Sequence, residues 1–125
     1  MTIKNILIVD DSRTEQIHLS EMLISEGYVT QVASDAVEAQ HLINTQRPDL
    51  ILLDVVMPGQ NGFQFARQLS RDPAFADIPI ILCTSKDQET DRVWGMRQGA
   101  RAYIVKPVQK AKLLDKIEII WPKTQ

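Results

Sequence analysis

The sequence predicts an α/β fold in which one parallel β-sheet is covered by helices on both faces. Two observations support this prediction. Short apolar runs recur along the chain, most of them without the alternation of a half-exposed strand, at residues 6–9, 28–33, 50–53, 80–83 and 102–105. A segment with apolar residues at helical spacing follows each run. Five strands that alternate with five helices, joined by right-handed crossovers, favour the flavodoxin-like doubly wound (βα)5 arrangement with strand order 2-1-3-4-5.

Residues suited to capping precede several of the expected helices. Ser12 and Glu15 have the spacing of a capping box, and Asn61 is a good cap for a helix over about 62–70. Asp35 or Ser34 caps a second helix, which Pro48 ends. The first helix turns Leu19, Met22, Leu23 and Ile24 inward, a further helix spans about 87–98, and the last carries Leu113, Leu114, Ile117 and Ile120. The segment 28–33 is more polar than the other runs and predicts a strand near an edge.

Composition narrows the function classes. The 125 residues fit a single domain, 44% of them are hydrophobic and 24% charged, and the net charge of −2 argues against non-specific binding of nucleic acid or an anionic membrane. Nothing approaches the ~20 apolar residues of a membrane helix. Cys83 is the only cysteine and lies in an apolar run, which predicts a buried thiol and a reducing compartment. We expect a cytoplasmic protein.

Polar residues stand where four of the predicted strands end. Asp10 and Asp11 follow the first strand, Asp54 the third, Thr84 the fourth and Lys106 the fifth. In the order 2-1-3-4-5 these strands are neighbours, and their carboxyl ends meet over one crevice. The sequence therefore predicts one site built from residues far apart along the chain.

The chemistry of that site follows from its residue types. Carboxylates brought together repel one another unless a cation lies between them, and oxygen ligands with open positions suit Mg²⁺. A lysine and a hydroxyl group on the rim would bind an anion. Carboxylates, Mg²⁺, lysine and hydroxyl are the components of phosphoryl transfer, in which a carboxylate is able to serve as the nucleophile. Asp54, alone at the end of the central strand, is the predicted nucleophile, and Asp10 with Asp11 are the predicted metal ligands.

These residues resemble the response-regulator receiver domain (CheY-like) of two-component signalling over essentially the whole chain. The resemblance rests on Asp10-Asp11-Ser12, Asp54 with Met57-Pro58-Gly59 and Gly62, Thr84-Ser85, Tyr103 and Lys106-Pro107. The segments 84–95 and 98–101 are similar to those of PilH-type regulators of type IV pilus twitching motility.

The resemblance implies a role for each site residue. Asp54 would accept a phosphoryl group from a histidine kinase of the CheA-like kind. Asp11 and Asp54 would bind Mg²⁺ with the backbone carbonyl of Val56, and Asp10 would act largely through water. Lys106 would pair with the phosphoryl oxygens, and the bond from Lys106 to Pro107 would be cis.

The resemblance also implies a switch. Thr84 would move toward the phosphoryl group and Tyr103 would follow it inward, which would alter the face formed by the fourth helix, the fifth strand and the last helix, where a downstream protein docks. Tyr103 and Trp94 are the predicted partner-face residues, and a role in packing is the alternative interpretation for each. Two positions depart from the commonest receiver pattern, Val56 and Lys86, and they predict slow self-dephosphorylation.

Three functional interpretations remain open. The first is a stand-alone switch, a single receiver domain over 1–125 with no output domain, acting through protein partners as a monomer or weak dimer. The second is a receiver-like docking module that phosphorylation does not regulate. The third, a phosphatase of the aspartyl-phosphate type, needs a second acid two residues after the nucleophile, and Val56 occupies that position. His18 and His41 lack metal-ligand spacing and are expected at the surface.

Overall fold

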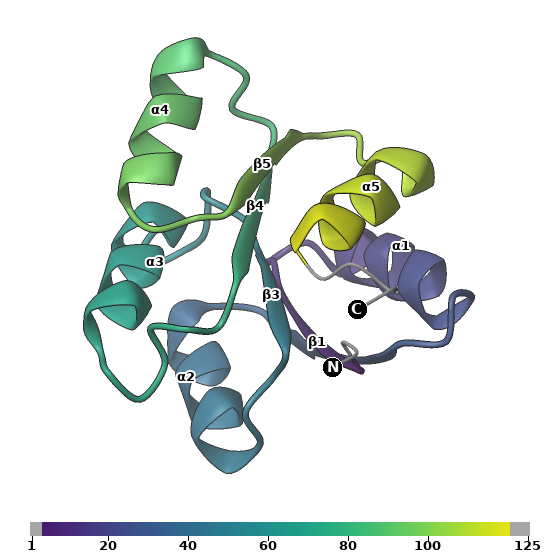
Figure 1. Ribbon diagram of the computed structural model, residues 1–125, viewed down its shortest axis with the longest axis horizontal. Helices are drawn as coiled ribbons and strands as arrows, with labels where there is room; N and C mark the ends of the chain where they lie inside the picture. Colours follow the sequence, from purple (N-terminus) through teal and green to yellow (C-terminus); the bar gives the residue numbers. More distant parts are fainter. Residues whose placement is uncertain (1–3, 121–125) are drawn as a thin grey trace.

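A five-stranded parallel sheet forms the centre of the molecule. The computed structural model describes residues 4–120. The strands are β1 (Asn5–Val9), β2 (Val29–Ala33), β3 (Leu50–Leu53), β4 (Ile80–Thr84) and β5 (Ala102–Val105), and they lie in the order β2-β1-β3-β4-β5 (Figure 1). The predicted fold class and strand order are confirmed.

Helices cover both faces of this sheet. In Figure 1, α1 (Arg13–Ile24) and α5 (Lys110–Ile120) lie on one side, and α2 (Ala36–Thr45), α3 (Gly62–Arg71) and α4 (Glu89–Arg97) lie on the other. Successive side chains of a strand point to opposite faces, so β1 and β3 supply two separate apolar cores. Leu7, Val9, Ile51 and Leu53 pack toward α2 and α3, whereas Ile6, Ile8, Leu50 and Leu52 pack toward α1 and α5.

The most polar strand lies at an edge, as its sequence predicts. β2 has only one fully buried residue, Ala33, and its Val29 is 58% exposed. In the central strands β3 and β4, by contrast, every residue is buried. A strand that pairs on one side only needs less apolar surface than these central strands. The buried Cys83 in β4 is also as predicted.

The helices follow the capping and packing predictions from the sequence, with three differences. Ser12, Asp35 and Asn61 each accept a hydrogen bond from a backbone N–H of the first turn. The first capping box is only half formed, because the N–H of Ser12 donates to Oδ1 of Asp10 (2.9 Å) and not to Glu15. Ile24 is 57% exposed and was wrongly expected to face the core. α4 begins at Glu89, two residues later than expected, after Gln88, whose side chain makes no capping hydrogen bond.

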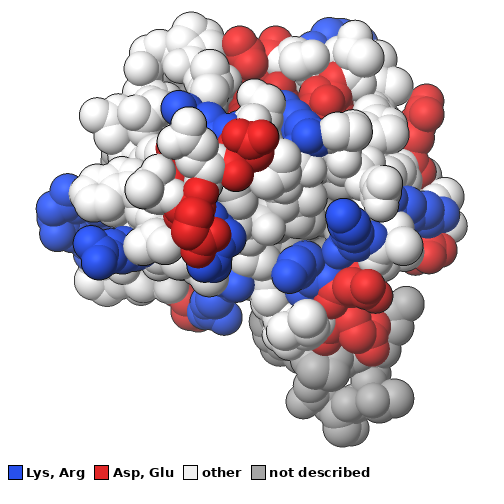
Figure 2. Space-filling model, turned by 90° about the horizontal axis from the view of Figure 1, so that it is seen from above, with Lys and Arg blue, Asp and Glu red and all other residues white. Residues whose placement is uncertain are grey.

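The described surface has no large field of one charge on the face shown in Figure 2, where basic and acidic side chains are interspersed. Both His18 and His41 are exposed, as expected. None of the helices within residues 4–120 has the length and apolar character required to cross a membrane.

Candidate phosphoacceptor and metal site

Backbone hydrogen bonds bring the ends of four strands to the same edge of the sheet. The N–H of Asp54 donates to the carbonyl of Val9 (2.9 Å), which holds the end of β3 against the end of β1. The N–H of Lys106 donates to the carbonyl of Thr84 (2.8 Å) and joins β5 to β4 in the same way. Residues separated by up to 96 positions therefore meet over one crevice, as the sequence predicts.

Three carboxylates converge in that crevice. Asp10, Asp11 and Asp54 each offer an oxygen, and these oxygens lie within 4.8 Å of one another. Asp10 and Asp54 are 1% and 6% exposed, whereas Asp11 is open to solvent. Like charges this close repel strongly where little water screens them, so a cation is needed to stabilise the cluster.

Lys106 supplies one positive charge. Its Nζ lies 2.6 Å from Oδ2 of Asp10 and 3.4 Å from Oδ2 of Asp54. Burial alone would lower the pKa of Lys106, but the hydrogen bond to Asp10 and the charge of Asp54 outweigh it and raise the pKa. Lys106 is therefore charged at neutral pH, and its ammonium balances one of the carboxylates.

The carboxyl group of Asp54 titrates abnormally. Burial raises its pKa, the Lys106 ammonium partly offsets this rise, and the Asp10 carboxylate adds to it. The ionised form, which a nucleophile or a metal ligand requires, is thus less stable in the folded protein than in water. The ionised Asp54 carboxylate therefore lowers the stability of the folded protein at neutral pH.

Asp54→Asn is therefore expected to raise the free energy of unfolding of the metal-free protein at pH 7. The folded carboxyl group holds its proton more tightly than the unfolded chain does, so ionisation favours unfolding at neutral pH. The gain of Asp54→Asn should shrink as the pH falls from the native pKa of Asp54 toward its ordinary value. Urea unfolding in the presence of a metal chelator measures this change in the free energy of unfolding, and Asp115→Asn, at an exposed position, is the control. A less stable Asp54→Asn at pH 7 would contradict it.

The arrangement fits Mg²⁺. Three carboxylates face a single ammonium, all the donors are oxygens, and the exposed Asp11 leaves room for water. A small dication that keeps part of its hydration shell matches these features. The backbone carbonyl of Val56, a ligand that the resemblance implies, belongs to the turn directly after β3, and its assignment stays a prediction.

Gly62 shapes the turn that follows Asp54. Its N–H donates to the carbonyl of Val55 (2.8 Å), and a Cβ at this position would lie 2.1 Å from the backbone oxygen of Asp54. α3 therefore begins against the end of β3 only because residue 62 has no side chain. Val56 in the same turn is 54% exposed, and its N–H donates to Oδ1 of Asp54 at 3.4 Å.

The predicted switch residues lie on adjoining strands. Thr84 is fully buried, and its Oγ1 accepts a hydrogen bond from the N–H of Lys86 at 3.4 Å. The hydroxyl of Tyr103 donates to the carbonyl of the same Lys86 (2.9 Å). Burial raises the pKa of Tyr103 to about 12, so this hydroxyl keeps its proton. The loop after β4 thus links Thr84 to Tyr103, whereas Trp94 lies apart on α4, 48% exposed.

Two residues of the site were missed by reasoning from the sequence. Gln16 is buried, and its Nε2 donates to the carbonyl of Asp10 (2.6 Å) and to Oγ of Ser34 (3.2 Å). Its spacing from Leu19 and Leu23, a polar residue on an apolar helix face, was the available signal. Glu15, expected in a capping box, instead has a buried Oε1 with no hydrogen-bond partner among the described residues. The bond from Lys106 to Pro107 is cis, as the resemblance implies.

Comparison with known proteins gives this site its class. Residues 6–118 match the response regulator receiver domain, and the chain belongs to that family. It is 49% identical over 115 residues to the protein PilH of Pseudomonas aeruginosa, across 92% of this chain and 95% of that protein. It is 37% identical to the phosphate regulon regulator PhoB of the same organism but spans only about half (53%) of PhoB. The chemotaxis protein CheY4 of Vibrio cholerae has a similar structure, with a TM-score of 0.87 at 28% identity over 95% of this chain and 99% of CheY4.

Membership of this family has direct consequences. The chain is a two-component signalling protein, and no enzyme family is indicated. Receiver domains bind Mg²⁺ at an acidic pocket, which corresponds here to the cluster of Asp10, Asp11 and Asp54. A histidine kinase as phosphodonor and a downstream partner follow in general terms from the same membership.

Proposed function

We propose that this protein is a stand-alone response regulator that accepts a phosphoryl group on Asp54 and thereby changes which protein it binds. The observation that carries the proposal is the position of the Asp54 carboxylate, at the end of the central strand within reach of two further acids and 3.4 Å from Lys106. We further propose a CheA-like kinase as the phosphodonor, a role in type IV pilus or chemotaxis-like signalling, and a cytoplasmic location. The PilH similarity and the lone thiol support these assignments.

The proposed transfer uses the residues of the crevice. An oxygen of Asp54 attacks the phosphorus of the kinase phosphohistidine, the P–N bond breaks, and its electron pair leaves with the imidazole. Lys106 exchanges its contact with Asp54 for one with a phosphoryl oxygen and remains paired with Asp10. Mg²⁺, held by Asp10, Asp11 and Asp54, would supply charge stabilisation for the phosphoryl oxygens.

The proposed output begins at the loop after β4. A phosphoryl group on Asp54 presents oxygens that are able to accept a hydrogen bond from Thr84, and a shift of Thr84 would disturb the loop that holds the Tyr103 hydroxyl. Tyr103 and Trp94 lie on β5 and α4, and we assign both to the face that a partner reads. New charge at one site would then alter a surface at another.

Phosphate incorporation from a small acyl-phosphate donor tests the proposal. We expect a Mg²⁺-dependent gain of one phosphoryl group by intact-mass spectrometry in the wild type, and none in Asp54→Ala. The matched control is Asp115→Ala on α5, which should be labelled like the wild type. Absence of an adduct in a wild type that still binds Mg²⁺ would favour the docking-module function, and turnover of free phosphate esters that depends on Asp54 would favour a phosphatase.

Val56 predicts a long-lived phosphorylated state. Its side chain is apolar and 54% exposed beside Asp54, so it cannot hydrogen-bond a water that attacks the acyl phosphate. We expect Val56→Asn to shorten the lifetime of phospho-Asp54 several-fold, measured by the decay of the adduct after the donor is removed. The control is Val29→Asn, 58% exposed at the start of β2 and so at the opposite edge of the sheet from Asp54. A lifetime of seconds in the wild type, unchanged in Val56→Asn, would refute this prediction.

A further inference from the structure

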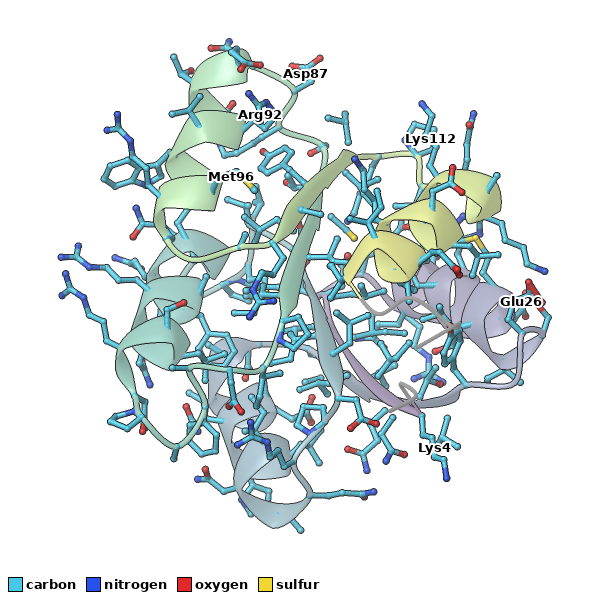
Figure 3. All side chains as sticks on the ribbon, in the orientation of Figure 1. Lys4, Glu26, Asp87, Arg92, Met96 and Lys112 are labelled. Atoms are coloured by element: carbon cyan, nitrogen blue, oxygen red, sulfur yellow. The ribbon has the colours of Figure 1, made fainter. Side chains whose placement is uncertain are left out.

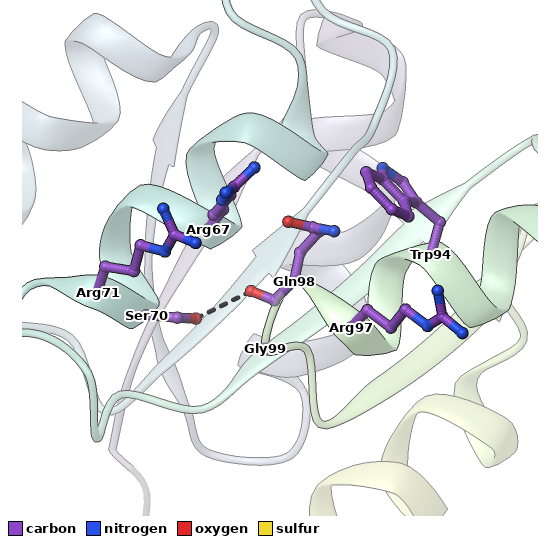
Figure 4. Close-up of a pocket in the computed structure, with 7 residues that line it drawn as sticks. All are labelled: Arg67, Ser70, Arg71, Trp94, Arg97, Gln98 and Gly99. Carbon is purple, nitrogen blue, oxygen red and sulfur yellow. Dashed lines mark hydrogen bonds between the residues drawn. The ribbon is translucent and has the colours of Figure 1, made fainter.

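A pocket of about 330 Å³ lies between the second halves of α3 and α4, outside the site described above. Its lining includes Arg67, Ser70, Arg71, Trp94, Arg97 and Gln98 (Figure 4). The two helices are joined at its base, where Oγ of Ser70 donates to the carbonyl of Gln98 (3.0 Å). Gly99 closes the same end, because a Cβ there would lie 2.0 Å from Oγ of Ser70. The pocket therefore has a rigid base and is not a gap between loose helices.

The pocket is lined by unneutralised positive charge. Arg67, Arg71 and Arg97 are exposed, and within residues 4–120 none of them forms an ion pair or a side-chain hydrogen bond. The chain has no acidic residue between Asp54 and Asp72, although its net charge is −2. Arg71 and Arg97 lie in the last turns of their helices, where the helix dipole favours a cation. Arg67 lies in the middle of α3, where the helix dipole does not favour a cation.

The side-chain amide of Gln98 also faces this pocket. Gln98 is only 7% exposed, yet its side-chain amide makes no hydrogen bond with any of the described residues. Figure 4 shows the amide directed between Arg67 and Trp94. A group that enters the pocket is therefore able to accept a hydrogen bond from the Gln98 amide in place of water.

We propose that this pocket binds an acidic segment of a partner protein. Arg67 and Arg71 are four residues apart on one helix face, which sets their Cβ atoms about 5–6 Å apart and suits two neighbouring carboxylates. The Gln98 amide donates to one of these carboxylates. The indole of Trp94, 48% exposed, provides an apolar surface for an adjacent side chain of the segment. The combination of paired cations with an apolar surface favours a peptide over a small inorganic anion.

The pocket lies away from the phosphoacceptor. Asp87 lies in the loop between β4 and α4, at the edge of the sheet where the strands end, and α4 then runs past Arg92 to Met96, away from this loop (Figure 3). Arg71, Arg97 and Gln98 lie at the opposite ends of their helices from that edge. A segment bound here leaves the crevice open, so the partner and a phosphodonor are able to bind together.

A titration of the full chain with a capped peptide of four glutamates around one phenylalanine tests the proposal. We expect saturable shifts of the NMR signals of the Trp94 indole N–H and the Arg67 and Arg71 Nε–H groups, and none with the glutamine counterpart of the peptide. Arg67→Gln/Arg71→Gln should weaken binding about tenfold. Lys112→Gln/Lys116→Gln removes the same charge at the same spacing on α5 and should change the affinity about twofold at most. Gln98→Met should weaken binding while both helices stay folded.

Several outcomes would overturn the proposal. The first is the absence of saturable shifts at Trp94. The second is equal weakening by the two double variants, which would indicate non-specific attraction. The third is displacement of the peptide by equimolar inorganic phosphate or ATP, which would make the pocket a small-anion site. Acyl-phosphate labelling of Asp54 should be the same in the wild type and Arg67→Gln/Arg71→Gln, so a loss of peptide binding in this variant is distinguishable from a loss of phosphorylation.

Discussion

Lys106→Met is expected to lower the free energy of unfolding of the metal-free protein by about 3 kcal/mol at pH 7. The ammonium of Lys106 lies 2.6 Å from Asp10 and 3.4 Å from Asp54, and its side chain is only 17% exposed. Without it, two buried carboxylates and the nearby Asp11 face one another with no counter-charge within the cluster. The loss should be large because both carboxylates are shielded from water.

Urea unfolding with and without Mg²⁺ measures this effect. Mg²⁺ should restore much of the stability of Lys106→Met, since a dication takes over the balancing of charge, and should stabilise it more than it stabilises the wild type. Adding Asp54→Asn to Lys106→Met should recover part of the loss in a double-mutant cycle. The exposed Lys112→Met is the control. A metal-free Lys106→Met as stable as the wild type would contradict the prediction.

Gly62→Ala should destabilise the protein by about 3 kcal/mol and displace Asp54, the proposed phosphoacceptor. Helix propensity alone predicts the opposite sign, because alanine at a helical position is more favourable than glycine by about 0.5–1 kcal/mol. The deciding contact is the 2.1 Å between a Cβ at residue 62 and the backbone oxygen of Asp54, together with 2.8 Å to Cα of Val55. Both neighbours are backbone atoms directly after a buried strand, so neither moves without shifting Asp54.

Two measurements separate the components of this prediction. Unfolding in urea gives the loss of stability, and the rate of labelling by an acyl phosphate reports the displacement of Asp54. Lys110→Ala, at the first position of α5, is the matched control and should change neither by much. A folded Gly62→Ala of wild-type stability and labelling rate would show that the turn after β3 adapts freely.

Pattern and topology together predict the fold and most of the site. Unbroken apolar runs such as Leu50–Leu53 require a sheet covered on both faces, and the order of its strands brings Asp10, Asp54 and Lys106 to one edge. These features depend on short-range periodicity and on a few connection rules, which a sequence carries explicitly. The polar residues at the strand ends were recognisable because they interrupt that periodicity.

Features that depend on side-chain geometry could not be predicted in the same way. The capping spacing of Ser12 and Glu15 gave no indication that Asp10 would take the N–H of Ser12. The exposed face of Ile24 and the later start of α4 depend on packing, which overrides local preference. The pocket between α3 and α4 joins residues about 30 positions apart, and helical spacing relates only the residues of one helix.

The buried thiol of Cys83 makes the native fold resistant to alkylating reagents. It is 1% exposed, and burial raises its pKa to about 12, so the reactive thiolate is nearly absent at neutral pH. Modification then requires β4 to leave the sheet, and the rate of alkylation reports how often that strand opens. Because Cys83 immediately precedes Thr84, this natural probe would monitor protection of the strand by Mg²⁺ or a phosphoryl group in the unmodified sequence.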